Sequence, residues 1–295
     1  MAQISKTNPD YDAISYFDII KSKRLEWKQM DTEFKRLCKV DVEKPTNSFY
    51  GNGIIYHYFV KNMIETPRNI KNYITFDKVL VDLELKKKWV DQAIKIGRTK
   101  LDYIRPQDLW ECYRRCKGSV NTFKAPMVRH LIKKYGATHF LDPTMGWGGR
   151  FLGAMAEGIK YTGIETNTDL FPGYKEMKRC FDKNDNATFY WEDCMKVDFE
   201  AIDYDFVLTS PPYGDMEKYR HMKEFGSDEM YYKGFLIPLI LKLKLFIKRD
   251  GPILINISNG IYDKYLSYGG IKAKDQMVLP QQMGGKKNKE MIYIF

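Results

Sequence analysis

The first 118 residues carry the spacing of amphipathic helices. Between residues 10 and 39, apolar side chains recur at helical intervals, first at Ala13, Phe17 and Ile20 and then at Trp27, Met30, Phe34 and Leu37. This spacing predicts one long helix or a pair of helices. Residues 77–97 repeat the pattern, and a further helix is expected from Arg105-Pro106 to Gly118, because proline suits a first turn and glycine follows a last one.

Residues 44–72 break this periodicity. They contain Pro45, Gly51, Gly53 and Pro67 among aromatic residues, so an irregular or partly extended segment is expected there. The sequence therefore predicts a mainly helical N-terminal region, residues 1–118, with a role in target recognition or partner binding.

From residue 125 onward, short apolar runs alternate with helical stretches. A helix is expected over residues 126–135 and closed by Gly136, and the strands are expected at 138–141, 161–164, 188–191, 206–209, 253–257, 276–279 and 291–295. Such alternation is typical of an α/β fold with a parallel sheet and crossover helices. Residues 119–295 are therefore predicted to form a second, α/β domain.

Composition and charge narrow the class of protein. With 295 residues, of which 44% are hydrophobic, the chain can bury one core of ordinary domain size and a smaller appendage. The formal net charge of +10 favours a polyanionic partner such as nucleic acid. The longest apolar run, residues 235–247, is interrupted by Lys242 and Lys244, and no apolar signal core opens the chain, so an intracellular protein without a membrane partner is expected.

The cysteines indicate neither a disulfide scaffold nor a metal site. There are five, they are scattered, and no two form a C-x-x-C pair. Only four histidines accompany them, none close in sequence to Cys112 and Cys116, the pair that would share a helix face. Buried thiols and no bound metal are expected.

The first strand of the second domain runs into a glycine-rich segment, Asp142-Pro143-Thr144-Met145-Gly146-Trp147-Gly148-Gly149. Its glycines let a ligand approach the backbone, and the helix that follows can hold an anion at its N-terminus. The third glycine of a dinucleotide-binding loop is replaced by Phe151, which disfavours a nicotinamide cofactor. The acid directly before the loop, Asp142, suits a cationic ligand.

Two more acids follow the next two strands. Glu165 ends the second strand, where a carboxylate can accept both hydroxyls of a ribose, and Asp193 follows the third. Taken singly, each is typical of a solvated carboxylate at a strand end. Together with Asp142 they match the ammonium, the ribose and the adenine amine of S-adenosylmethionine, which is the cofactor that the sequence predicts.

The fourth strand ends in Ser210-Pro211-Pro212-Tyr213, and this segment predicts the reaction. Each residue before a proline is driven toward extended backbone, so the segment is stiff. The Ser210 hydroxyl and the Pro211 carbonyl can accept hydrogen bonds from an amino group and so favour the pyramidal nitrogen that attacks a methyl sulfonium. Tyr213 can stack on a base turned out of its helix. The alternative is a proline-rich turn with a core tyrosine.

Residues 118–295 thus resemble the amino-methyltransferases that make N4-methylcytosine or N6-methyladenine, including stand-alone enzymes of restriction–modification systems, bacteriophages and large viruses. The resemblance implies a Rossmann-like sheet of seven strands with the last strand antiparallel. It also implies that Asp142 contacts the methionine part of the cofactor, Glu165 the ribose and Asp193 the adenine, with Phe123 packed on the cofactor. The expected cofactor contacts are Phe123, Asp142, Pro143, Thr144, Gly146, Gly148, Glu165, Asp193 and Cys194.

The chain departs from the family in two ways. Trp147 replaces a small residue of the glycine loop, and no large segment follows the final strand, where such enzymes carry a target-recognition domain. Target selection is therefore expected from the N-terminal region, from the loop of residues 214–228, or from a partner. That loop holds Lys218, Tyr219, Arg220 and His221, which suit phosphates and bases, although an exposed loop without such a role would show the same composition.

The segment from Ser210 to Tyr213 favours cytosine N4 over adenine N6, because adenine enzymes usually have Asp or Asn where Ser210 stands. Methylation of cytosine carbon 5 is disfavoured, since it needs a cysteine after a proline, and Cys194 follows Asp193 instead. DNA is favoured over RNA as the nucleic-acid partner. An RNA-base amino-methyltransferase and a non-catalytic nucleic-acid-binding subunit remain alternatives, and the oligomeric state is left open.

Overall fold

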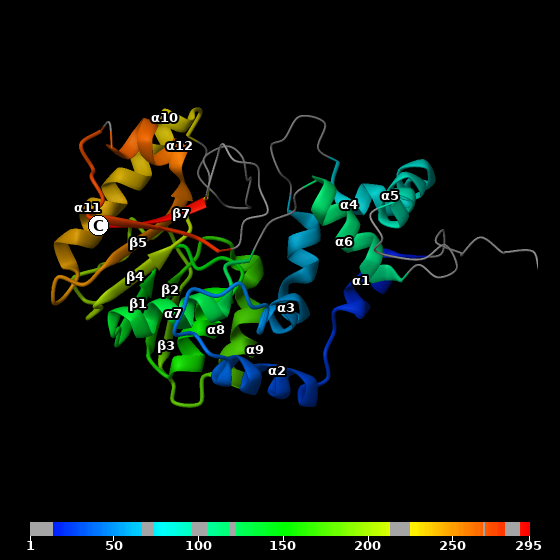
Figure 1. Cartoon of the computed structure of the whole chain (residues 1–295), viewed down its shortest axis with the longest axis horizontal. Coiled ribbons are helices and arrows are strands. Elements are labelled where there is room, and N and C mark those ends of the chain that lie inside the picture. The colour runs from blue at the N-terminus through cyan, green and yellow to red at the C-terminus, as the bar shows by residue number, and fades with distance from the viewer. Residues whose placement is uncertain are drawn as a thin grey trace, which may run out of the picture.

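The computed structural model describes residues 14–66, 74–95, 105–117, 122–212, 225–267, 269–280 and 290–295. Six helices make up the described part of the N-terminal region: α1 (Tyr16–Ser22), α2 (Trp27–Lys39), α3 (Asn52–Glu65), α4 (Phe76–Val81), α5 (Leu83–Lys95) and α6 (Pro106–Lys117). In Figure 1, α1, α3, α4, α5 and α6 lie to the right of the sheet, and α2 lies below α8 (Gly149–Glu157) and α9 (Phe171–Phe181). The predicted helical character of this region is confirmed, including a helix pair over residues 16–39.

One prediction for this region is wrong. Residues 44–72 were expected to be irregular, yet α3 occupies the middle of that range. Its apolar residues, among them Ile54, Phe59 and Met63, are buried because the helix packs against both the other N-terminal helices and the sheet domain. A helix covered on several sides carries no simple amphipathic stripe, and the glycine at each side of its first residue concealed its start.

The second part of the chain is built on a seven-stranded sheet. Its strands are β1 (His139–Asp142), β2 (Lys160–Ile164), β3 (Ala187–Tyr190), β4 (Phe206–Thr209), β5 (Ile253–Ser258), β6 (Asp275–Val278) and β7 (Glu290–Ile294). The strand order is β3-β2-β1-β4-β5-β7-β6. β7 runs antiparallel to both of its neighbours, whereas the pairs from β3 to β5 are parallel. The predicted Rossmann-like methyltransferase sheet is confirmed, and each expected strand is displaced by at most one residue at its start.

Helices cover both faces of this sheet (Figure 1). They are α7 (Ala125–Tyr135), α8 (Gly149–Glu157), α9 (Phe171–Phe181), α10 (Asp228–Tyr231), α11 (Ile237–Phe246) and α12 (Asn259–Ile261), with a 3-10 turn at Thr168–Leu170 and π-helical turns at Tyr232–Leu236 and Tyr262–Ser267. Successive residues of a strand point to opposite faces, so Phe140 and Phe206 enter one core while Leu141 and Val207 enter the other.

The N-terminal helices share a core with the sheet domain. One cluster of buried side chains includes Phe59 of α3 together with Phe151 of α8 and Tyr174 of α9. The rings of Phe59 and Tyr174 lie 5.2 Å apart between centroids. The glycine loop and α8 are therefore braced from outside by the N-terminal region.

At Gly149, the first residue of α8, the helix backbone lies close to the backbone of Phe123. A Cβ added there would lie 1.9 Å from the backbone oxygen of Phe123. Replacing Gly149 with alanine should lower the free energy of unfolding by at least about 1–3 kcal/mol, because backbone atoms must move apart. Urea unfolding midpoints measure this. Gly234→Ala is the matched control, since among the described residues the nearest atom to its added Cβ would be a ring atom of Phe225 at 3.8 Å. Equal losses in both variants would contradict the close approach.

Candidate active site

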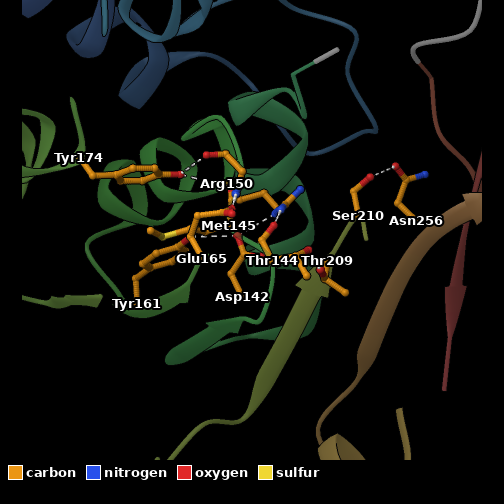
Figure 2. A network of polar contacts seen from close by, with 11 residues as sticks. Asp142, Thr144, Met145, Arg150, Tyr161, Glu165, Tyr174, Thr209, Ser210 and Asn256 are labelled. Carbon is orange, nitrogen blue, oxygen red and sulfur yellow. Dashed lines mark hydrogen bonds and ion pairs between the residues drawn. The ribbon is translucent and has the colours of Figure 1, made fainter. Parts of the chain in front are cut away.

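The candidate site lies where the order of the strands reverses. β1 and β4 are neighbours in the sheet, and the chain leaves β1 toward β2 on one side but leaves β4 toward β5 on the other. Open α/β sheets bind their ligands at the carboxyl ends of the strands beside such a point. The glycine loop follows β1, and Ser210 follows β4. The hydroxyl oxygens of Thr144 and Thr209, one from each segment, lie 2.5 Å apart (Figure 2).

Hydrogen bonds hold the backbone of the glycine loop in one shape. The Tyr174 hydroxyl donates to the backbone oxygen of Gly146 at 2.9 Å and lies 3.2 Å from that of Met145, while Arg150 donates to the oxygen of Thr144. Gly146 and Gly148 have φ angles of 56° and 84°, which residues with a Cβ rarely adopt. Thr144 and Gly146 are partly exposed while Pro143 and Met145 are buried, so the loop is accessible at Thr144 and Gly146.

Asp142 is fully buried and forms an ion pair with Arg150. Its Oδ2 atom accepts from Arg150 Nε at 2.7 Å and from the Tyr161 hydroxyl at 2.9 Å (Figure 2). Burial raises the pKa of Asp142, and the Arg150 guanidinium opposes that rise. The other oxygen, Oδ1, is buried and makes no hydrogen bond of normal geometry with the described residues, although the Thr144 backbone N–H also favours the charged form. Asp142 therefore stabilises the glycine loop through Arg150, which also donates to the Thr144 oxygen.

Glu165 lies at the end of β2, as the sequence predicts, and contacts the same loop. Its Oε2 atom accepts from the Gly146 N–H and its Oε1 atom from the Asn167 N–H, both at 2.9 Å. Burial raises the pKa of Glu165, and these N–H donors oppose the rise. Glu165 is partly exposed, and a carboxylate can accept further hydrogen bonds beside those from backbone N–H groups.

Asp193 and Cys194 follow β3. Asp193 is half-buried, and its Oδ1 atom accepts from the Met195 N–H at 2.9 Å, which leaves Oδ2 without a hydrogen bond in the described part of the chain. Cys194 is 5% exposed, and burial raises the pKa of its thiol to about 12. A thiol with this pKa stays protonated at neutral pH, so Cys194 is not prepared to act as a nucleophile.

Ser210 contacts a polar residue on the neighbouring strand. Its hydroxyl lies 3.1 Å from Oδ1 of Asn256, which is in β5 and is 3% exposed (Figure 2). Asn256 Nδ2 donates to the backbone oxygen of Met291 at 2.9 Å and lies 3.3 Å from Glu290 Oε2. A backbone oxygen only accepts, so Nδ2 must face Met291 and Oδ1 must face Ser210. Ser210 therefore donates its hydrogen to Asn256, and none of the described residues donates a hydrogen bond to its oxygen.

Other predicted site residues are placed only in part. Pro211 is buried and Pro212 half-buried beyond β4. Phe123 is 9% exposed, and its ring centroid lies 5.8 Å from the guanidinium carbon of Arg150, beside the glycine loop. Tyr213, Lys218, Tyr219, Arg220 and His221 lie outside the described residues.

Sequence reasoning missed the residues that support the site: Arg150, Tyr161, Tyr174, Thr209 and Asn256. Two of these residues, Arg150 and Asn256, stand out by their position in the sequence. Arg150 directly follows the glycines of the loop, and Asn256 is the one polar residue within the apolar run 253–257. The tyrosines look like ordinary core residues, because only the fold brings their hydroxyls to the loop.

The described residues show neither a metal cluster nor a membrane span. They contain no group of three or more histidine, cysteine, aspartate or glutamate side chains that could hold a metal ion. No helix formed by these residues is long and apolar enough to cross a membrane.

No protein-family model matches the sequence, and no curated protein matches it either. The structure is similar to a tRNA m1G37 methyltransferase of M. jannaschii, with 12% identity and a TM-score of 0.38 over 57% of this chain and 47% of that chain. It is also similar to an rRNA methylase of Streptococcus thermophilus, with 11% identity and a TM-score of 0.38 over 59% of this chain and 98% of that one. A third similar structure is the SAH-bound methyltransferase PaMTH1 of Podospora anserina, with 10% identity and a TM-score of 0.37 over 70% of this chain and 86% of that one.

The present chain spans about half the length of the first of these proteins. At such identities and TM-scores, no activity is carried over from them. The class of fold therefore rests on the strand order and on the antiparallel β7, and the function must be argued from the site itself.

Proposed function

We propose that this protein transfers a methyl group from S-adenosylmethionine to the exocyclic amino group of a nucleic-acid base, with cytosine N4 in DNA as the first candidate. The observation that carries the proposal is the orientation of Ser210. Its hydrogen is donated to Asn256, and so its oxygen can only accept a hydrogen bond from a group that approaches it. An amino group, which has hydrogens to donate, is the matching partner.

The residues around the glycine loop fit the cofactor. Glu165 offers a carboxylate to a ribose. Oδ2 of Asp193, which no described residue contacts by a hydrogen bond, can accept from an adenine amine, and the partly exposed Thr144 and Gly146 allow close approach. Asp142 is too deeply buried to hold the methionine ammonium through Oδ2, so we assign it to the support of the loop. When bound there, S-adenosylmethionine supplies an electrophilic methyl group.

Ser210 and Pro211 act on the base. The amino nitrogen of cytosine is a poor nucleophile because its lone pair is delocalised into the ring. Two acceptors, the Ser210 oxygen and the Pro211 carbonyl, hold its hydrogens and favour the pyramidal nitrogen. As the nitrogen attacks the methyl carbon, the carbon–sulfur bond breaks, its electron pair stays on sulfur, and the nitrogen gives up one proton to solvent. Tyr213 stacks on the base in this proposal, a contact that any of the four bases can make.

Incubation with radiolabelled S-adenosylmethionine and either DNA or RNA tests the proposal. Label should pass to DNA, and at low ionic strength the affinity for DNA should fall steeply as salt is added, because phosphate contacts release counterions. Label on RNA alone would replace DNA by RNA as the substrate. Label on neither, from a protein that binds the cofactor, would leave a non-catalytic binding subunit and overturn the proposed activity.

Cys194 provides a separate prediction. Cys194→Ala should keep methyl transfer within about twofold of the wild type, because a thiol with a pKa of about 12 supplies no thiolate at neutral pH. Initial rates at saturating cofactor measure this, and Cys180→Ala, which changes a half-buried thiol outside the site, is the control. A loss of 100-fold or more at Cys194 alone would indicate covalent catalysis and contradict the proposed chemistry.

A further inference from the structure

A groove of about 770 Å³ lies between α2 and the segment that leads into α3. Lys28, Thr32, Glu33 and Arg36 of α2 line one side, and Phe49 and Tyr50 line the other. We propose that this groove binds a single-stranded segment of DNA, with bases stacked on Phe49 and Tyr50 and phosphates held by Lys28 and Arg36.

Both aromatic side chains of the groove are exposed. Phe49 is 65% exposed and Tyr50 is 40% exposed. The ring of Phe49 is held in place, because the ammonium of Lys124 lies 3.6 Å from its centroid. A cation over an aromatic face attracts the ring and fixes its orientation. The result is a preformed platform whose remaining surface faces the groove and solvent.

Lys124 itself lacks an anionic partner among the described residues. It is 6% exposed, and its ammonium donates to the backbone oxygen of Asn47 at 3.1 Å and to the Asn47 side chain. No carboxylate in that part of the chain forms a salt bridge with it, and burial lowers its pKa to about 8. A buried cation without a carboxylate leaves positive charge beside the Phe49 ring, which favours a polyanionic strand in the groove.

Within the described ranges, the cations of the groove wall are also free of salt bridges. Lys28 and Arg36 are exposed, and neither forms a salt bridge with a carboxylate of the described residues, although burial raises the pKa of the Glu33 carboxyl and the charge of Arg36 opposes that rise. They are eight residues apart on α2, roughly 12 Å along the helix axis, which is enough for more than one nucleotide. The one acid of the wall, Glu33, is occupied, because its Oε1 atom accepts from the N–H groups of Gly51 and Gly53 at 2.9 Å and 2.8 Å.

Aromatic platforms and cations select a single strand over a duplex. In a duplex the faces of the bases are covered by their neighbours, whereas an unpaired strand offers them to Phe49 and Tyr50. The inference rests on the proposed function only in the choice of DNA as the nucleic acid. It assigns a binding role to the N-terminal region, for which the sequence predicts target recognition without indicating the residues.

Fluorescence anisotropy with labelled oligothymidylate of about twelve nucleotides, measured on the full chain without cofactor, tests the groove. Phe49→Ala should bind about tenfold more weakly than the wild type, and Arg36→Gln should bind more weakly with a shallower dependence on salt. Phe17→Ala and Lys35→Gln are the matched controls. Phe17 is 77% exposed on α1, and Lys35 lies on α2 but pairs with Asp31 at 2.7 Å. Both controls should bind as the wild type does.

Photo-crosslinking locates the contact. An oligonucleotide that carries iododeoxyuridine should crosslink to the peptide containing Phe49 and Tyr50. Crosslinks confined to other peptides, unchanged affinity in Phe49→Ala, or equal affinity for a duplex of the same length would each overturn the inference. If binding depends on Phe49 but the wild type transfers no methyl group, only the proposed function fails. If transfer occurs but Phe49→Ala binds normally, only this inference fails.

Discussion

Ser210→Ala is expected to lower the rate of methyl transfer by about 100-fold or more while cofactor affinity stays within about twofold of the wild type. The alanine removes the oxygen that accepts from the amino group. It leaves the glycine loop unchanged, because the polar contact of the Ser210 side chain is with Asn256 and none is with the described residues of the loop. Single-turnover rates with saturating DNA, together with calorimetric titration of S-adenosylmethionine, separate the two effects. An equal loss of rate and of cofactor affinity would show that Ser210 is structural.

Asn256 extends this prediction because it acts through Ser210. Asn256→Leu frees the serine hydroxyl to rotate and to offer its hydrogen instead of a lone pair, so transfer should fall about tenfold with the cofactor still bound. In the Ser210→Ala background the same substitution should cost nothing further. Additive losses in this double-mutant cycle would contradict the positioning role. Asn186→Leu, which changes an asparagine near the other end of the sheet, is the control for general destabilisation.

Arg150→Met should lower the free energy of unfolding by about 3–5 kcal/mol, because it leaves the Asp142 carboxylate buried and unpaired. Asp142 is 0% exposed and Arg150 is 5% exposed, so water cannot replace the lost partner. The variant also removes the bond to the Thr144 oxygen, and cofactor affinity should fall with it. Urea unfolding at neutral pH measures the stability.

The sign of the pH dependence gives a further check on that variant. Without Arg150 the pKa of Asp142 is left to rise further with burial, so the folded state takes up a proton more readily than the unfolded chain. The loss of stability should therefore be largest at neutral pH and shrink as pH falls toward about 4. Arg179→Met, which breaks the exposed pair with Glu176, should leave the free energy of unfolding almost unchanged, because solvent screens that pair. Similar losses in both variants would contradict a buried ion pair.

The sheet was predictable because its signal is local. Each strand is a short apolar run between turn residues, and the alternation of strands and helices fixes a parallel arrangement. Gly136 ends α7 with φ of 60°, as its position after the last turn indicates. The helix α3 was not predictable in the same way, since its burial on several sides depends on partners that are distant in sequence.

The residues of the candidate site also differ in whether their roles depend on local sequence or on contacts between distant residues. Glu165, Asp193 and Ser210 follow strands, and the residues next to a strand end can be read from the sequence. The role of Asp142 could not, because the sequence shows an acid before the loop but not the Arg150 guanidinium and Tyr161 hydroxyl that enclose it. Asn256 orients Ser210 across 46 residues of sequence, and only the pairing of β4 with β5 brings the two together.

The central claim is that an amino nitrogen of a base receives the methyl group, and the position of the methyl in the product nucleoside tests it most directly. DNA incubated with the protein and isotopically labelled S-adenosylmethionine should be digested to nucleosides and analysed by mass spectrometry against synthetic standards. The account predicts labelled N4-methyldeoxycytidine, and labelled N6-methyldeoxyadenosine would keep the amino group while changing the base. A label found only on a ring carbon, such as carbon 5 of cytosine, or only on a ring nitrogen would contradict it.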